Sequence, residues 1–173
     1  AGLQFVEVNL SAVQCMDTQL PERLLSIAEG YGVSTSEINL EITESAMVYS
    51  INTMRSVMEK LTKDGFSFAL DDFGTGRANL SYLQNFPFRI IKVDKSFLWA
   101  EGESEDNHVI FENMLSLIRG LRREAVAEGV ETKEQRDMLI SHGVEYLQGF
   151  YYSKPVPEQE FMKYLEEFEA AKQ

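Results

Sequence analysis

The sequence holds a single cysteine, Cys15, and comparatively few basic residues. One cysteine excludes an internal disulfide, so the chain does not require an oxidising compartment. Lysines and arginines number 16 against 28 aspartates and glutamates, which gives a formal net charge of −12. This charge argues against a surface for polymeric nucleic acid, because such a surface needs a basic stripe. A small anionic substrate remains compatible with it, since bound cations reverse the local field.

Long apolar runs and an N-terminal signal peptide are also missing. No run reaches the roughly 18 apolar residues that a membrane-spanning helix needs. With 44% hydrophobic residues in a length of 173, the chain has enough apolar material for one globular core. We expect a cytoplasmic domain, whose parent protein could be anchored to a membrane by flanking sequence.

Strand-like and helix-like segments alternate six times along the chain. Apolar alternation predicts strands over residues 5–10, 38–43, 67–72, 89–94, 125–131 (with the exit loop) and 146–150. Helical spacing, caps and prolines predict helices between these strands. Three of them cover residues 21–32, 51–65 (capped by Ser50) and 80–83. The other three begin at residue 106 or 107, after the capping box of Thr132 and Gln135, and after Pro157. Such alternation indicates a parallel sheet, either closed into a barrel or doubly wound.

Polar side chains at the strand ends favour the barrel. A different strand ends near each of Asn9, Glu41, Asp71, Lys92, Glu128 and Gln148. A (β/α) barrel builds its active-site face in this way, whereas an open sheet concentrates its signal at one switch point. We therefore predict an α/β fold, a TIM-like (β/α) barrel that is incomplete because about six of its eight strands are present.

The adjacent carboxylates Asp71 and Asp72 precede a glycine-bracketed turn, Phe73-Gly74-Thr75-Gly76. Two unit charges about 4 Å apart repel by about 1 kcal/mol in water and by roughly 4 kcal/mol at an effective dielectric of 20. A divalent cation turns this repulsion into attraction, and oxygen ligands suit Mg²⁺, Mn²⁺ or Ca²⁺.

Together with Asn9, Glu41 and Glu128, the two aspartates form an expected cage for one or two hard cations. Cations held there would polarise a phosphoryl oxygen and generate hydroxide from bound water. Lys92 would either lose its proton beside the metals and act on the attacking water, or stay charged and stabilise charge on phosphate. The pattern favours metal-assisted phosphoester hydrolysis; the alternative enzyme is a barrel that enolises a carboxylate substrate with Lys92 and Mg²⁺.

The two histidines, His108 and His142, lie at a helix start and a helix end. Their spacing matches no zinc motif, so we interpret them as surface groups.

Seven short segments carry a resemblance to a known family. They are 8–11 (Val-Asn-Leu-Ser), 40–45 (Leu-Glu-Ile-Thr-Glu-Ser), 71–76 (Asp-Asp-Phe-Gly-Thr-Gly), 91–97 (Ile-Lys-Val-Asp-Lys-Ser-Phe), 127–132 (Ala-Glu-Gly-Val-Glu-Thr), 148–150 (Gln-Gly-Phe) and 153–155 (Ser-Lys-Pro). On these segments the chain resembles the EAL domain family, the cyclic-di-GMP phosphodiesterases of bacterial signalling.

The resemblance implies a barrel, a two-metal site with Mg²⁺ or Mn²⁺, and hydrolysis of cyclic di-GMP to linear pGpG. It assigns metal ligation to Asn9, Glu41, Asp71, Asp72 and Glu128. It also gives catalytic roles to Lys92, which would hold the nucleophilic water, and to Glu128, which is proposed as the base. It assigns support of the metal–water cluster to Asp94 and Gln148, and ordering of the loop and of the site's edge to Glu44 and Glu131.

The Glu-Ala-Leu motif that names the family has no match in this sequence. We therefore expect residues 1–173 to be an EAL domain that misses its N-terminal strand and helices, with open sheet edges that favour a homodimer. Hydrolysis by this chain would be slow or absent, and a catalytically inactive cyclic-di-GMP receptor or regulatory scaffold is the alternative. A GGDEF or sensory domain on the same parent chain is a further expected partner.

Overall fold

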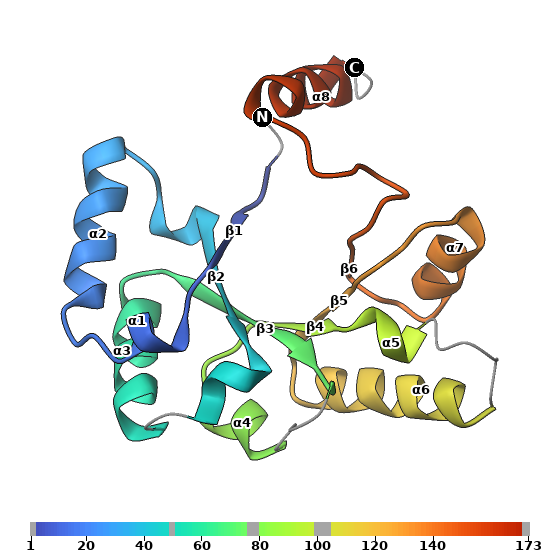
Figure 1. Cartoon of the computed structure of the whole chain (residues 1–173), viewed down its shortest axis with the longest axis horizontal. Helices are drawn as coiled ribbons and strands as arrows, with labels where there is room; N and C mark the ends of the chain where they lie inside the picture. Colours follow the sequence, from blue (N-terminus) through green and yellow to red (C-terminus); the bar gives the residue numbers. More distant parts are fainter. Residues whose placement is uncertain (1–2, 49–50, 76–79, 99–104, 171–173) are drawn as a thin grey trace.

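A computed structural model describes residues 3–48, 51–75, 80–98 and 105–170. Its one sheet has six parallel strands in the order β1-β2-β3-β4-β5-β6, which is also their order in the chain. The strands are β1 (Val6–Asn9), β2 (Ile38–Thr43), β3 (Ser67–Phe73), β4 (Ile90–Val93), β5 (Glu124–Ala127) and β6 (Tyr146–Leu147). The sheet curls into half of a barrel with most of the helices around its outer side, while the C-terminal helix stands apart beside the N-terminus (Figure 1). This arrangement confirms the predicted incomplete barrel.

The helices lie where the sequence predicts them, with some additions. They are α1 (Ala12–Cys15), α2 (Leu20–Tyr31), α3 (Ile51–Lys63), α4 (Leu80–Asn85), α5 (Lys95–Leu98), α6 (Glu105–Gly120), α7 (Lys133–Ser141) and α8 (Glu158–Ala170), with 3-10 turns η1 (Thr35–Glu37) and η2 (Glu44–Val48). Thr132 and Gln135 form the predicted capping box of α7. Gly32 ends α2 in the left-handed conformation with φ of 66°, as a glycine does without strain. The predicted cap Ser50 lies outside the described residues.

Two short helices, α1 and α5, were not predicted from the sequence. Ser11 caps α1 through a reciprocal pair of hydrogen bonds with Gln14. At the start of α5, the carboxylate of Asp94 accepts a hydrogen bond from the backbone N–H of Ser96 at 2.9 Å. Helices of one turn carry too few residues to show a helical period, so only their caps mark them in a sequence.

The core divides between the two faces of the sheet. Outward side chains of β2, β3 and β4, such as Leu40 and Phe68, pack with α3 residues such as Met58 in the main hydrophobic cluster. Inward side chains form a small second cluster of Ala69, Ile90 and Val126. Successive strand residues alternate between the faces, so the polar residues of the strand ends are left to the inner face of the half-barrel.

The two edge strands approach each other at the amino end of the sheet. Phe5, just before β1, and Tyr146 of β6 pack edge to face with ring centroids 5.7 Å apart. On the outer side of β1, Val6 and Val8 are 53% and 47% exposed. Among the described residues, no helix combines the length and the hydrophobicity that crossing a bilayer requires.

Candidate active site at the carboxyl ends of the strands

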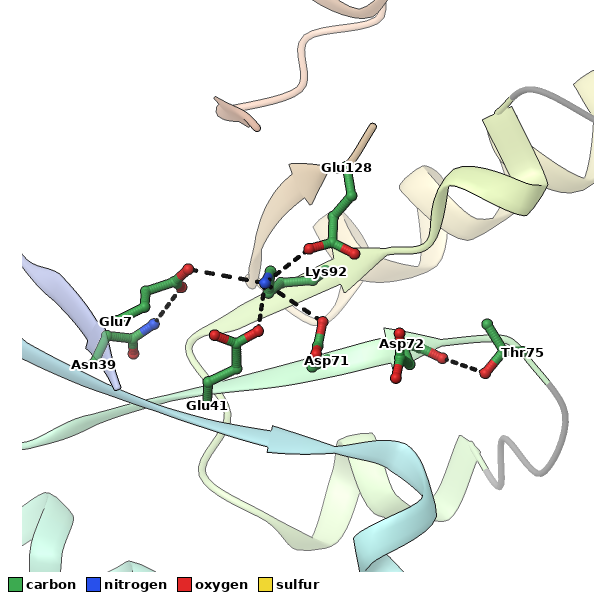
Figure 2. A network of polar contacts seen from close by, with 8 residues as sticks. All are labelled: Glu7, Asn39, Glu41, Asp71, Asp72, Thr75, Lys92 and Glu128. Carbon is green, nitrogen blue, oxygen red and sulfur yellow. Dashed lines mark hydrogen bonds and ion pairs between the residues drawn. The ribbon is translucent and has the colours of Figure 1, made fainter. Parts of the chain in front are cut away.

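Lys92 lies at the centre of a ring of carboxylates inside the half-barrel (Figure 2). Its side chain comes from β4 and is only 3% exposed. The ammonium Nζ forms a close ion pair with Glu41 and lies 2.8 Å from Oε1 of Glu128 and 3.4 Å from Oδ1 of Asp71. A fourth acid, Glu7, lies 4.0 Å away. These acids come from strands β1, β2 and β3 and from the residue after β5, so the cluster exists only in the folded sheet.

Strand register explains why these side chains converge. Asn9 of β1 pairs with Glu41 of β2, and Glu41 pairs with Ala69 of β3, two residues before Asp71. Side chains two residues apart on a strand share a face, so Glu41 and Asp71 both point inward. All strands run parallel, which brings their carboxyl ends to a single rim of the half-barrel.

A β-bulge lets Asp72 join the same rim as Asp71. Leu70 pairs with Ile91 and Phe73 pairs with Val93, so three steps along β3 match two steps along β4. At the bulge, the backbone of Asp72 adopts a left-handed conformation with φ of 56°. In a regular strand the adjacent carboxylates would face opposite sides of the sheet. With the bulge, carboxylate oxygens of Asp72, Asp94 and Glu128 lie within 4.8 Å of one another.

The excess of carboxylates raises the affinity of the site for positive charge. Burial raises the pKa of Glu41 to about 7, although its hydrogen bond from Lys92 acts in the opposite direction. Burial also raises the pKa of Glu128, where Lys92 again opposes the change and the charges of Asp71 and Asp72 add to it. Burial raises the pKa of Asp72, reinforced by the charge of Asp71. Burial is the largest cause of each shift, and the neighbouring carboxylates add to it.

The acids around Lys92 favour its protonated form. Burial by itself would lower its pKa, but the hydrogen bonds with Glu128 and Glu41 raise the pKa above the ordinary value for lysine. The expected lowering of its pKa therefore requires bound metal, and the residues alone favour the charged form.

The donor set fits a pair of hard divalent cations. One group of mutually close ligand atoms comes from Glu41, Asp71 and Glu128, and a second comes from Asp72, Asp94 and Glu128. Both groups consist of carboxylate oxygens, the ligands that Mg²⁺ and Mn²⁺ prefer. Oδ1 of Asp71 is buried and accepts no hydrogen bond from any described residue. The ion pair with Lys92 at 3.4 Å offsets part of the cost of burying this atom, and a bound divalent cation would satisfy it directly.

The other predicted site residues take different positions. Asn9 lies beside Glu41 at the end of β1 and is exposed. Glu44 is buried behind the rim, where Oε2 accepts a hydrogen bond from the backbone N–H of Gly74 at 2.9 Å. Gln148 and Glu131 are exposed, and neither belongs to the groups of close carboxylates among the described residues.

Three polar residues one layer deeper were missed by the sequence analysis. Nδ2 of Asn39, whose side chain is fully buried, donates to Oε1 of Glu7 at 2.9 Å. The amide oxygen of Asn39 accepts a hydrogen bond from Oγ of Ser67 at 2.8 Å. Glu7, Asn39 and Ser67 each come from an inward position before a rim residue of the same strand. The alternation of the strands already contained this signal, since Glu7 shares its face with Asn9.

An apolar groove adjoins the cluster between β1 and β6. It has a volume of about 530 Å³ and is lined by residues that include Phe5, Glu7, Tyr146, Gln148 and Tyr152. Ligand pockets of roughly 300–1,000 Å³ accommodate small molecules. Gln148 thus lies at the groove rather than in the carboxylate cluster.

Comparison with known proteins gives concordant matches. The family model of the EAL domain matches residues 1–155. The cyclic di-GMP phosphodiesterase PdeL of Escherichia coli is 38% identical over 157 residues, which cover 91% of this chain and 43% of PdeL. This chain therefore spans less than half the length of that relative.

Solved structures agree with the sequence matches. The EAL domain of Mycobacterium smegmatis DcpA superposes with a TM-score of 0.87 at 34% identity, covering 94% of this chain and 73% of that one. A manganese and cyclic-di-GMP complex of Klebsiella pneumoniae BlrP1 has a TM-score of 0.80 at 29% identity, covering 89% of this chain and 40% of that one.

Proposed function

The chain belongs to the EAL domain family, and on this premise we propose that it binds cyclic di-GMP and hydrolyses it to linear pGpG with two Mg²⁺ or Mn²⁺ ions. The observation that carries the proposal is the pair of carboxylate groups that share Glu128 beside Lys92. A structural relative, BlrP1, was solved with manganese and cyclic di-GMP, and a sequence relative, PdeL, is a cyclic di-GMP phosphodiesterase.

We assign one group of ligands to Glu41, Asp71 and Glu128, with Asn9 alongside, and the other to Asp72, Asp94 and Glu128. Ions bound there would supply Lewis acidity toward a phosphoryl oxygen and lower the pKa of a bound water. Lys92 would hold the attacking water and stabilise negative charge that develops on the phosphate. Glu128, whose pKa is raised by burial, would accept the proton of that water.

The remaining residues would position these groups. Glu44 would hold the loop after Asp72 through Gly74, and Glu131 would order the edge of the site. Gln148, at the rim of the apolar groove, would contact the substrate or its bound water, and the aromatic rings of the groove would receive a guanine base. We assign all of these roles to one EAL domain that comprises residues 1–173.

The decisive experiment titrates the chain with cyclic di-GMP in the presence of EDTA, Mg²⁺ or Mn²⁺, and measures both binding and pGpG formation. The proposal expects metal-dependent binding and pGpG formation, at a rate that increases when a segment with a Glu-Ala-Leu motif is joined ahead of β1. Equal binding in EDTA without pGpG in any condition would instead identify a metal-independent receptor. Absence of binding in all conditions would reject both functions.

A further inference from the structure

Both histidines of the chain meet at one point on the outside of the half-barrel. His108 belongs to α6, and His142 is the residue at which α7 ends. Their rings pack edge to face with centroids 5.6 Å apart, and Phe111 packs on the ring of His142. Both are surface groups, as the sequence predicts, because His108 is exposed and His142 is half-buried. Their contact with each other was not predicted. Sequence spacing failed here because the residues come from different helices.

Glu112 completes a group of three possible ligands. It lies four residues after His108, so both side chains project from the same face of α6. Oε1 of Glu112 lies 3.4 Å from Nε2 of His108 and 3.5 Å from Nε2 of His142. Zinc–nitrogen and zinc–oxygen bonds of about 2.0–2.2 Å give a tetrahedron whose ligand atoms are about 3.3–3.6 Å apart. Both separations fit an edge of that tetrahedron.

The tautomer of His142 also suits a metal ligand. Its Nδ1 lies 2.8 Å from the backbone oxygen of Met138. A carbonyl oxygen only accepts, so Nδ1 carries the hydrogen of the neutral ring and Nε2 keeps its lone pair. Metal-binding histidines generally donate their second ring N–H in this manner, which fixes the orientation of the ring.

Neighbouring groups leave Glu112 available. Among residues 3–48, 51–75, 80–98 and 105–170, the basic side chains within 4.0 Å of the Glu112 carboxylate are those of the two histidines. The nearby cation Arg119 donates instead to the backbone oxygen of His142, which fastens the end of α7 to α6. The three ligand atoms lie within 4.8 Å of one another, so small rotations of the exposed side chains bring them to one ion.

We propose that His108, Glu112 and His142 form a binding site for Zn²⁺ or a chemically similar transition-metal ion, with water in the fourth position. Two imidazole nitrogens and one carboxylate suit zinc, whereas the all-oxygen groups around Lys92 suit Mg²⁺ or Mn²⁺. The ion would join α6 to α7, the helices that precede and follow β5. It would thereby restrain the segment that leads to Glu128, without contact with the carboxylate cluster.

Nuclear magnetic resonance of the imidazole nitrogens tests this site directly, because the chain has only two histidines. Zn²⁺ is titrated into the ¹⁵N-labelled chain in excess Mg²⁺, which occupies the all-oxygen groups. We expect the Nε2 signals of both histidines to shift together as one equivalent binds, while the Nδ1–H of His142 stays protonated. The midpoint of thermal unfolding should rise in the same titration.

Three variants decide the outcome. His108→Ala and Glu112→Gln should each weaken Zn²⁺ binding at least tenfold, because even the loss of an outer-shell partner costs about 10–100-fold in affinity. Glu29→Gln, which removes an exposed acid from α2, is the matched control and should bind Zn²⁺ like the parent chain. Unchanged imidazole signals, or equal Zn²⁺ affinity in all three variants, would overturn the proposal.

Discussion

Lys92 is the residue on which the charge balance of the carboxylate cluster depends. We predict that Lys92→Met destabilises the ion-free chain by about 3–5 kcal/mol, the usual cost of breaking a buried ion pair. The reason is that Glu41, Glu128 and Asp71 would face one another without their shared cation. Urea unfolding in EDTA measures the effect, and added Mg²⁺ should restore part of the loss.

A surface lysine provides the control for that variant. Lys60 pairs with Glu22 on the outside of the molecule, where both side chains are more than half exposed. Lys60→Met should change the free energy of unfolding far less than Lys92→Met, because water screens exposed pairs. Equal destabilisation by the two variants would contradict a special role of Lys92 in holding the acids together.

The raised pKa values of the acids predict how stability depends on pH. A carboxyl whose pKa is higher in the folded than in the unfolded chain favours folding at low pH, and this contribution is lost as the pH rises through the folded value. Burial raises the pKa of Glu41 from 4.5 to about 7, and the pKa of Glu128 and Asp72 also rises. Lys92 stays charged throughout this range, so its contribution is constant.

We therefore expect the free energy of unfolding of the ion-free chain to fall as the pH rises from 4.5 to about 7. Saturating Mg²⁺ should stabilise the chain more at the upper end of this range, because protons no longer compete for the carboxylates. Urea unfolding at a series of pH values, with EDTA or with Mg²⁺, measures both trends. Stability that increases with pH in EDTA would contradict the raised pKa values of the buried acids.

At the scale of residues, predictions from the sequence succeeded where side chains alternate between the two faces of a strand. The inward positions of Glu41, Asp71 and Lys92 follow directly from strand alternation, and the structure brings them together. The buried Asn39 and the acid Glu7 share that alternation, but a sequence does not show that they are hydrogen-bonded to each other. The meeting of His108 and His142 depends on how two helices pack, which local spacing does not encode.

At the scale of elements, the bulged end of β3 determines where Asp72 points. The turn after it requires Gly74, whose φ is 101°, and a Cβ there would lie 2.7 Å from the ring of Phe97. We predict that Gly74→Ala destabilises the chain by about 1–3 kcal/mol through backbone strain, and by more if the ring cannot move. Urea unfolding provides the measurement, and metal affinity should fall with it.

Gly30 is the matched control for this glycine. It lies within α2, and a Cβ there would meet no atom within 4 Å. Gly30→Ala should stabilise the chain by about 0.5–1 kcal/mol, because alanine favours a helix over glycine. If the two variants changed stability in the same direction, the strained turn would not be the cause.

Element boundaries were predicted well for long segments and poorly for short ones. The predicted strand over 38–43 coincides with β2, and Gly32 ends α2 as expected. The predicted strand over 146–150 shrinks to Tyr146–Leu147, because the chain turns at Gly149 close to the backbone of Val130. A Cβ at Gly149 would lie 2.1 Å from that backbone oxygen, a contact between loops that no local pattern reveals.

At the scale of the whole molecule, the half-barrel leaves strand edges at β1 and β6. Such edges pair readily with another chain, and the exposed Val6 and Val8 on β1 would be covered by it. We predict that the 173-residue chain forms a homodimer in solution, as measured by multi-angle light scattering, and that Val8→Lys shifts it to monomer. The control Ile140→Lys, at an exposed position of α7, should leave the dimer intact.

A monomer at all concentrations would contradict this prediction, as would a dimer that survives Val8→Lys with unchanged affinity.

The fold class could be predicted from the sequence alone. Six alternations of strand and helix predicted the parallel sheet, and polar strand ends distinguished the barrel from an open sheet. The contacts that cover the open side of the half-barrel join distant segments or separate chains. Local sequence patterns do not predict such contacts.

The ammonium at the middle of the acid ring has one more consequence. Lys92 is a positive charge within the chain itself, so the acids from different strands have a counterion before any divalent ion binds. We therefore expect the chain to fold in EDTA, and we expect divalent ions to be needed for the proposed hydrolysis rather than for the fold.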